Sequence, residues 1–196
     1  MFSYFTQRPN LVFEAARRGD HAQVVRHLEQ GHSPNKRGPY GQTALHYACG
    51  LRQLDMLIDL LHYKANPNAQ DHRGFTPLLL AVYVGDAKLV SSLLSHGAQY
   101  HIGFPGGYTP LCLAASLGHV AIITLLVEAG APLSARHNQH FCPYVEAVLH
   151  NQFPAYNLLL RHQSEHRHRK PQPNKKRPIS ALEIESPPPK KNQPWW

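Results

Sequence analysis

The chain has 196 residues, of which 42% are hydrophobic and 16% charged, with 20 Lys and Arg against 12 Asp and Glu. This length suits one domain with an extension, and the composition excludes a collagen, a coiled coil and a disulfide-rich scaffold. Only three cysteines occur, and the first residues lack the basic and apolar pattern of a signal peptide. We therefore expect an intracellular, soluble protein with no membrane segment.

After a short N-terminal arm, residues 1–9, a period of 33 residues organises the chain. Threonine recurs at three positions with this spacing, and glycine recurs at another phase with Lys64 as one substitute. Alanine recurs without interruption at Ala15, Ala48, Ala81, Ala114 and Ala147. Such a register without insertions predicts a repeat protein.

Residues 74–97 show what one unit contains. Thr76 is suited to cap a helix that begins at Pro77. Gly85 interrupts the chain before a second apolar stripe, and Gly97 follows that stripe as a stop signal. Helices of about 8 to 10 residues are too short to be stable alone in water, so neighbouring units must stack into a solenoid.

Three segments of the chain, GQTALHYACG (41–50), GFTPLLLAVYVGD (74–86) and GYTPLCLAASLGH (107–119), carry a common motif. They resemble the G-x-T-P-L-H-x-A-A-x-x-G-H signature of the ankyrin repeats. The resemblance covers residues 10–163 and implies an all-α helix-turn-helix solenoid of about five repeats. Its expected units are 10–40, 41–73, 74–106, 107–139 and 140–163. The first and last units depart from the motif, as expected for caps, and Cys142 takes the place of Thr in the last.

Neither catalysis nor a cofactor is expected. The chain has no phosphate-binding glycine loop, no nucleophile elbow and no paired carboxylates in a shared context. The resemblance implies that His46 has a structural role, with its ring hydrogen-bonded within or between repeats. His137, His140 and Cys142 lie close together but lack a fourth zinc ligand at a compatible spacing. His162, His166 and His168 form a similar group, and for both groups we expect polar surface, not a metal site.

Binding is expected on the concave surface that the hairpin tips and inner helices of such a solenoid line. Aromatic side chains and arginine anchor many protein interfaces. The candidate partner-binding residues are Tyr40, Arg73, Phe75, Tyr83, Tyr108 and Phe141. Phe75, Tyr108 and Phe141 share one repeat phase and predict a ladder of rings. The alternative is that these rings pack against neighbouring hairpins. The expected partner is an apolar or mildly acidic protein segment.

Residues 164–196 differ sharply in composition, with eight Lys and Arg, three Glu and seven of the 17 prolines. Such a segment buries too little apolar surface to fold, so we predict a disordered basic tail. It resembles a bipartite nuclear import signal, with the clusters Arg167, Arg169 and Lys170, then Lys175, Lys176 and Arg177. The alternatives are a solubilising tail and contact with nucleic acid. With only Trp195 and Trp196 available to stack on bases, we do not expect nucleic-acid binding.

The sequence as a whole favours a monomeric, non-enzymatic adaptor in the nucleus or the cytoplasm, with an import receptor as a further partner. One alternative is an inhibitor of a transcription factor, similar to the short cytoplasmic inhibitors of this family. Another is contact with nucleic acid through the basic tail. A ubiquitin-ligase receptor is disfavoured, because the tail shows no amphipathic helical box. Two apolar islands in the tail, Ile179–Glu185 and Trp195–Trp196, are candidates for short linear motifs.

Overall fold

The computed structural model describes residues 10–104, 108–133 and 143–168. These residues form ten α-helices and no strand. In chain order the helices are α1 (Leu11–Arg18), α2 (His21–Glu29), α3 (Ala44–Gly50), α4 (Leu54–His62), α5 (Pro77–Tyr83), α6 (Ala87–Ser95), α7 (Pro110–Leu117), α8 (Val120–Glu128), α9 (Pro143–Leu149) and α10 (Phe153–His168). Within the described ranges, no helix combines the length and the apolar content needed to cross a membrane.

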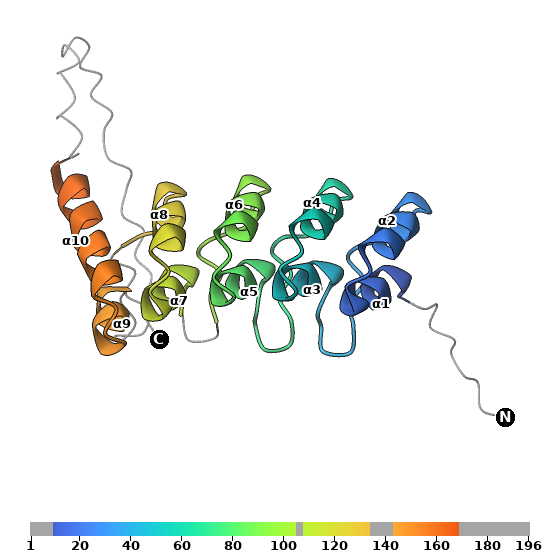
Figure 1. The fold of residues 1–196 in the computed structure, drawn as a ribbon, viewed down its shortest axis with the longest axis horizontal. Helices are drawn as coiled ribbons and strands as arrows, with labels where there is room; N and C mark the ends of the chain where they lie inside the picture. Colours follow the sequence, from blue (N-terminus) through green and yellow to red (C-terminus); the bar gives the residue numbers. More distant parts are fainter. Residues whose placement is uncertain (1–9, 105–107, 134–142, 169–196) are drawn as a thin grey trace, which may run out of the picture.

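The helices are arranged in two rows (Figure 1). The odd-numbered helices form one row, the even-numbered helices form the other, and loops project beyond the odd-numbered row. Each odd-numbered helix packs against its even-numbered successor and against the next helix of its own row. This arrangement confirms the all-α repeat solenoid. The odd-numbered row is called the inner row below, and the even-numbered row the outer row.

The helices of the inner row begin as the repeated motif predicts. The Oγ1 atom of Thr76 accepts a hydrogen bond from the backbone N–H of Leu79, 3.2 Å away. Thr109 accepts one from the N–H of Cys112 at 3.3 Å. In both helices proline follows the threonine, where no backbone donor is needed. The threonine and proline of the motif therefore define where each of these helices starts.

The 33-residue register places equivalent side chains at equivalent depths. The alanines at the repeated position of the inner helices α3, α5, α7 and α9 are all 0% exposed. Leucine recurs in the outer row with the same spacing, and these residues are also 0% exposed: Leu60, Leu93, Leu126 and Leu159. The backbone follows the same register at the turns. Lys64, which stands where other repeats have glycine, has a φ of 64° and so adopts the left-handed conformation. The repeat geometry therefore overrides the ordinary preference of a lysine.

The last helix is longer than the other helices of the outer row. Gln163 occupies the phase at which Gly97 and Gly130 end earlier repeats with positive φ angles, but it does not adopt a positive φ. No proline occurs between Pro154, at the second position of the helix, and Pro171. The helix α10 therefore continues to His168, beyond the boundary at Gln163 that the change in composition suggested.

Candidate partner-binding surface

Exposed apolar side chains occur at the ends of four neighbouring helices of the inner row. They stand at the last residue of α5, α7 and α9 and directly after the last residue of α3. Their exposed fractions are 47% for Leu51, 61% for Tyr83, 37% for Leu117 and 68% for Leu149. Because adjacent inner helices pack on each other, the ends of these four helices follow one another along the inner row. We call this set of residues, Leu51, Tyr83, Leu117 and Leu149, the inner strip.

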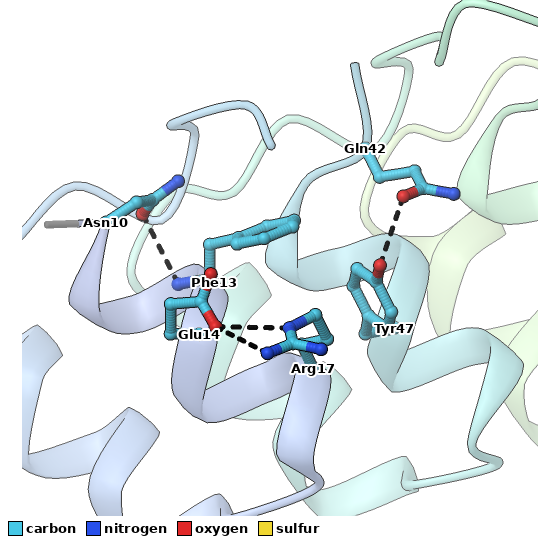
Figure 2. Close-up of polar contacts among 6 residues, drawn as sticks. All are labelled: Asn10, Phe13, Glu14, Arg17, Gln42 and Tyr47. Atoms are coloured by element: carbon cyan, nitrogen blue, oxygen red, sulfur yellow. Dashed lines mark hydrogen bonds and ion pairs between the residues drawn. The ribbon is translucent and has the colours of Figure 1, made fainter. Parts of the chain in front are cut away.

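A cavity of about 230 Å³ opens beside the first member of the inner strip. It lies between α3 and α5, and its lining includes Tyr47, Leu51 and Leu80. The Tyr47 hydroxyl donates a hydrogen bond to Gln42 Oε1, 3.1 Å away, as Figure 2 shows. A dry cavity of about 150 Å³ holds a benzene ring, so this one has room for one apolar side chain of a partner.

Charge replaces apolar surface at the α1 end of the inner row. Arg17 donates from Nε and Nη2 to the Glu14 carboxylate, at 3.1 and 3.0 Å (Figure 2). The start of α1 is held by Asn10, whose Oδ1 accepts from the N–H of Phe13 at 3.3 Å. The Phe13 ring packs edge-on against Tyr47, with 5.3 Å between centroids. The first repeat is thus joined to the wall of the cavity.

The anchors predicted from the sequence divide into two groups. Tyr40 is 71% exposed, and Tyr83 and Arg73 are also exposed. Phe75 and Tyr108 are half-buried. Phe104 lies between these two rings, with its centroid 4.5 Å from that of Phe75 and 6.3 Å from that of Tyr108. Phe75 and Tyr108 therefore pack within the hairpin region. This agrees with the alternative hypothesis, in which the rings pack against neighbouring hairpins.

Phe141, the remaining predicted anchor, lies outside the described residues. The ladder of three rings and the full predicted set therefore stay predictions.

Tyr108 also has a polar partner inside the stack. Its hydroxyl donates to Glu146 Oε2 at 3.0 Å, and Glu146 is only 5% exposed. His150 Nε2 lies 3.7 Å from the same carboxylate oxygen. Burial raises the pKa of Tyr108 to about 12. This pair therefore joins α9 to the loop before α7 and gives a buried carboxylate its donor, which is a structural role.

His46 connects two repeats. Its Nδ1 accepts a hydrogen bond from the Thr43 N–H at 3.1 Å, and its Nε2 donates to the Phe75 carbonyl at 3.0 Å. Burial lowers the pKa of the ring, which favours the neutral form that this pattern requires. The structural role expected for His46 is confirmed.

Comparison with protein families identifies the architecture. A family model described as ankyrin repeats (3 copies) matches residues 12–103, and the model of a single ankyrin repeat matches residues 106–138. The chain belongs to the ankyrin repeat family. Ankyrin repeats are generally protein–protein interaction modules, and the proteins built from them are typically non-enzymatic. A search of curated proteins finds no match to the chain.

Among the side chains that the structure describes, in residues 10–104, 108–133 and 143–164, no group of three or more His, Cys, Asp or Glu is placed to hold a metal ion. Of the histidine groups singled out in the sequence, His137, His140 and Cys142 lie outside those ranges. His162, His166 and His168 lie on α10.

The basic clusters fall at the end of this ankyrin repeat domain. Arg167 belongs to α10, so the first cluster begins on a helix. The other import-signal residues lie outside the described residues: Arg169, Lys170, Lys175, Lys176 and Arg177.

Sequence reasoning missed the aliphatic part of the surface. Leu51, Leu117 and Leu149 were not among the predicted anchors, and neither were the cavity residues Tyr47 and Leu80. A usable signal was present, because apolar residues recur just before the break between the two helices of a repeat.

Proposed function

We propose that this protein is a non-enzymatic adaptor that binds an apolar protein segment along the inner strip. The observation that carries the proposal is the strip itself, with an exposed apolar side chain at the end of each of four neighbouring inner helices and a cavity beside Leu51. Monomeric soluble proteins seldom expose a continuous apolar surface without a use for it. An aliphatic or aromatic side chain of the partner would enter the cavity between Tyr47 and Leu80.

Exposed arginines on the loops between repeats favour acidic residues in the partner. Arg73 and Arg37 are exposed on the loops between repeats, and Arg37 donates from Nη1 to the Gln70 carbonyl at 2.9 Å. Glu146, which lies on the same helix as Leu149, is buried and hydrogen-bonded. An apolar segment flanked by Asp or Glu therefore suits this surface best, and complementary charge would mainly increase the association rate.

Purification of protein complexes from cells, with this protein as the bait, tests the proposal. The bait carries Leu51→Ala and Tyr83→Ala, changes that remove exposed surface and leave the core intact. Tyr63→Ala is the matched control, because Tyr63 is 42% exposed and follows α4 in the outer row. The proposal predicts a partner that is lost with the inner-row bait and kept with the control, both baits being folded by circular dichroism. Equal capture by all baits would contradict it.

We further propose that the basic clusters direct the protein to the nucleus. The support is compositional: six Lys and Arg gather between Arg167 and Arg177 in a segment that contains prolines. Changing Lys175, Lys176 and Arg177 to Ala should shift a fusion too large for passive pore passage toward the cytoplasm. Lys190→Ala with Lys191→Ala is the matched control. An unchanged distribution of the triple variant would remove the import role.

Inhibition of a transcription factor is the narrower form of the same adaptor function, and contact with nucleic acid is the competing form. Salt-titrated binding to unrelated nucleic-acid sequences separates them, because phosphate contacts give a steep salt dependence without sequence preference. The adaptor proposal predicts no such binding at physiological salt.

A further inference from the structure

The two ends of the helix rows differ in chemistry. At the α1–α2 end, a surface hollow is lined by four charged or polar residues, Glu14, Arg18, Asp20 and Gln23, together with His27, Leu11 and Ala15. A terminal repeat of a solenoid needs such polar surface, because no neighbour covers it. The α9–α10 end, at the opposite end of the rows in Figure 1, carries exposed apolar side chains: Val145, Val148, Phe153 and Leu160. We call the surface around Val145, Val148 and Leu160 the end face.

Internal repeats bury the positions that the end face exposes. His46, one of the equivalents of Val145, donates a hydrogen bond to a carbonyl of the following repeat. Cys112, another equivalent, is 0% exposed, whereas Val145 is 45% exposed. Ala115 is 0% exposed, whereas its equivalent Val148 is 48% exposed. These positions face the place that a further repeat would occupy.

The outer row shows the same contrast. Leu160 of α10 is 40% exposed, whereas Val127, its equivalent in α8, is 7% exposed. Both helices of the last repeat therefore present aliphatic side chains on the side where the stack stops. A surface of this kind costs solubility unless something covers it.

We propose that residues 179–184 of the same chain dock on the end face and replace the absent repeat. The chain leaves α10 at His168, so the ten residues 169–178 connect the helix to this segment. Ten extended residues span up to about 33 Å. Along α10, Leu160 lies only about 12 Å back from His168, and Phe153 about 22 Å. The connection is therefore long enough to return to the end face at Leu160.

The chemistry of the segment matches the surface. It supplies three aliphatic side chains, Ile179, Leu182 and Ile184, in a region otherwise rich in proline and charge. The inter-repeat positions inside the stack are likewise occupied by aliphatic and small side chains. The other apolar pair of the tail, Trp195 and Trp196, would close a longer loop at a greater entropic cost and supplies no aliphatic side chain.

A double-mutant cycle on the full chain tests this cap. The face variant is Val145→Thr with Val148→Thr, which keeps the shape of the side chains and adds hydroxyls. The segment variant is Ile179→Ser, Leu182→Ser and Ile184→Ser. Hydrogen exchange of the α9 and α10 amides is the readout. The segment variant should speed this exchange on the order of tenfold, because covering even one aliphatic side chain is worth about that factor. Combining both variants should add little beyond the larger single effect.

The control variant is Trp195→Ser with Trp196→Ser, which should leave the exchange of α9 and α10 unchanged. The proposal is overturned if the segment variant has no effect, or if the face and segment effects are additive. It is also overturned if the tryptophan variant has the larger effect. A dimer of the full chain by light scattering that the face variant dissociates would assign the end face to a second copy instead. The inner strip is altered by none of these variants, so capture of a partner is independent of the result.

Discussion

His46 Nε2 donates a hydrogen bond to the backbone carbonyl of Phe75 across 3.0 Å, so a side chain of one repeat is tied to the loop before the next. The ring also accepts from the Thr43 N–H through Nδ1. Each nitrogen thus has one defined role, and the arrangement needs a neutral imidazole. Protonation would turn the acceptor into a donor that faces another donor.

This contact predicts a pH-dependent stability. Burial lowers the pKa of His46 in the fold, so the unfolded chain binds its proton first as the pH falls below about 6.5. Stability that is present at neutral pH is therefore lost as the pH falls toward the folded-state pKa. His46→Leu, the residue type found at the equivalent position 79, should reduce the drop in melting temperature between neutral and acidic pH. The other histidines are the same in both proteins, so an identical drop in both would contradict the role of His46.

The repeat register predicts where a charge is not tolerated. Ala81 is 0% exposed between packed helices, so Ala81→Asp buries a carboxylate without a partner. We expect a loss of more than about 4 kcal/mol in the free energy of unfolding, measured by thermal denaturation. Ala121→Asp, on the exposed side of α8, should change it by no more than about 0.5 kcal/mol. Equal melting of the two variants would mean that the register is wrong.

The hydrogen bond from Tyr108 to Glu146 predicts that removing the Tyr108 hydroxyl lowers the free energy of unfolding. Tyr108→Phe removes the donor 3.0 Å from a carboxylate that is 5% exposed, leaving His150 at 3.7 Å. The expected loss is about 1–3 kcal/mol in urea unfolding. Tyr40→Phe removes an equally polar hydroxyl from a side chain that is 71% exposed, and should be nearly neutral. If both variants unfold at the same urea concentration, the buried contact contributes nothing.

Two thiols report on opening of the stack. The side chains of Cys49 and Cys112 are 0% exposed, and burial raises the pKa of the Cys49 thiol. In a Cys142→Ser background, a thiol reagent should label neither residue in the folded protein at neutral pH, since the thiolate is the reactive form. Labelling should be complete in denaturant. Rapid labelling under native conditions would show that the repeats separate readily.

Much of the fold could be predicted from local chemistry. Thr76 and Pro77 specify a helix start, and the recurrence of Ala81 in every repeat specifies the buried face. The conformation of Lys64 followed from its phase alone. The end of α10 was harder, because a change in composition at residue 164 does not stop a helix. A helix ends where a residue adopts a different backbone conformation, and Gln163 does not.

The site was less accessible to sequence reasoning. Repeat phase gives the position of a residue in its unit, so Tyr40 and Tyr83 were correctly expected at the surface. Phase does not reveal which side chain fills the space between two hairpins. Phe104 takes that space and contacts both Phe75 and Tyr108, although it stands at a different phase from either. Tertiary packing therefore decided the role of these rings.

Site-specific photocrosslinking in cells tests the proposed binding surface most directly. A photoreactive phenylalanine analogue would replace Tyr83 of the inner strip in one protein and Tyr63 of the outer row in another. Both sites are exposed tyrosines at helix ends, so the probes differ mainly in the surface they sample. Binding along the inner strip predicts a discrete protein adduct from position 83 and none of that mass from position 63. An adduct from position 63 alone, or the same adduct from both, would contradict it.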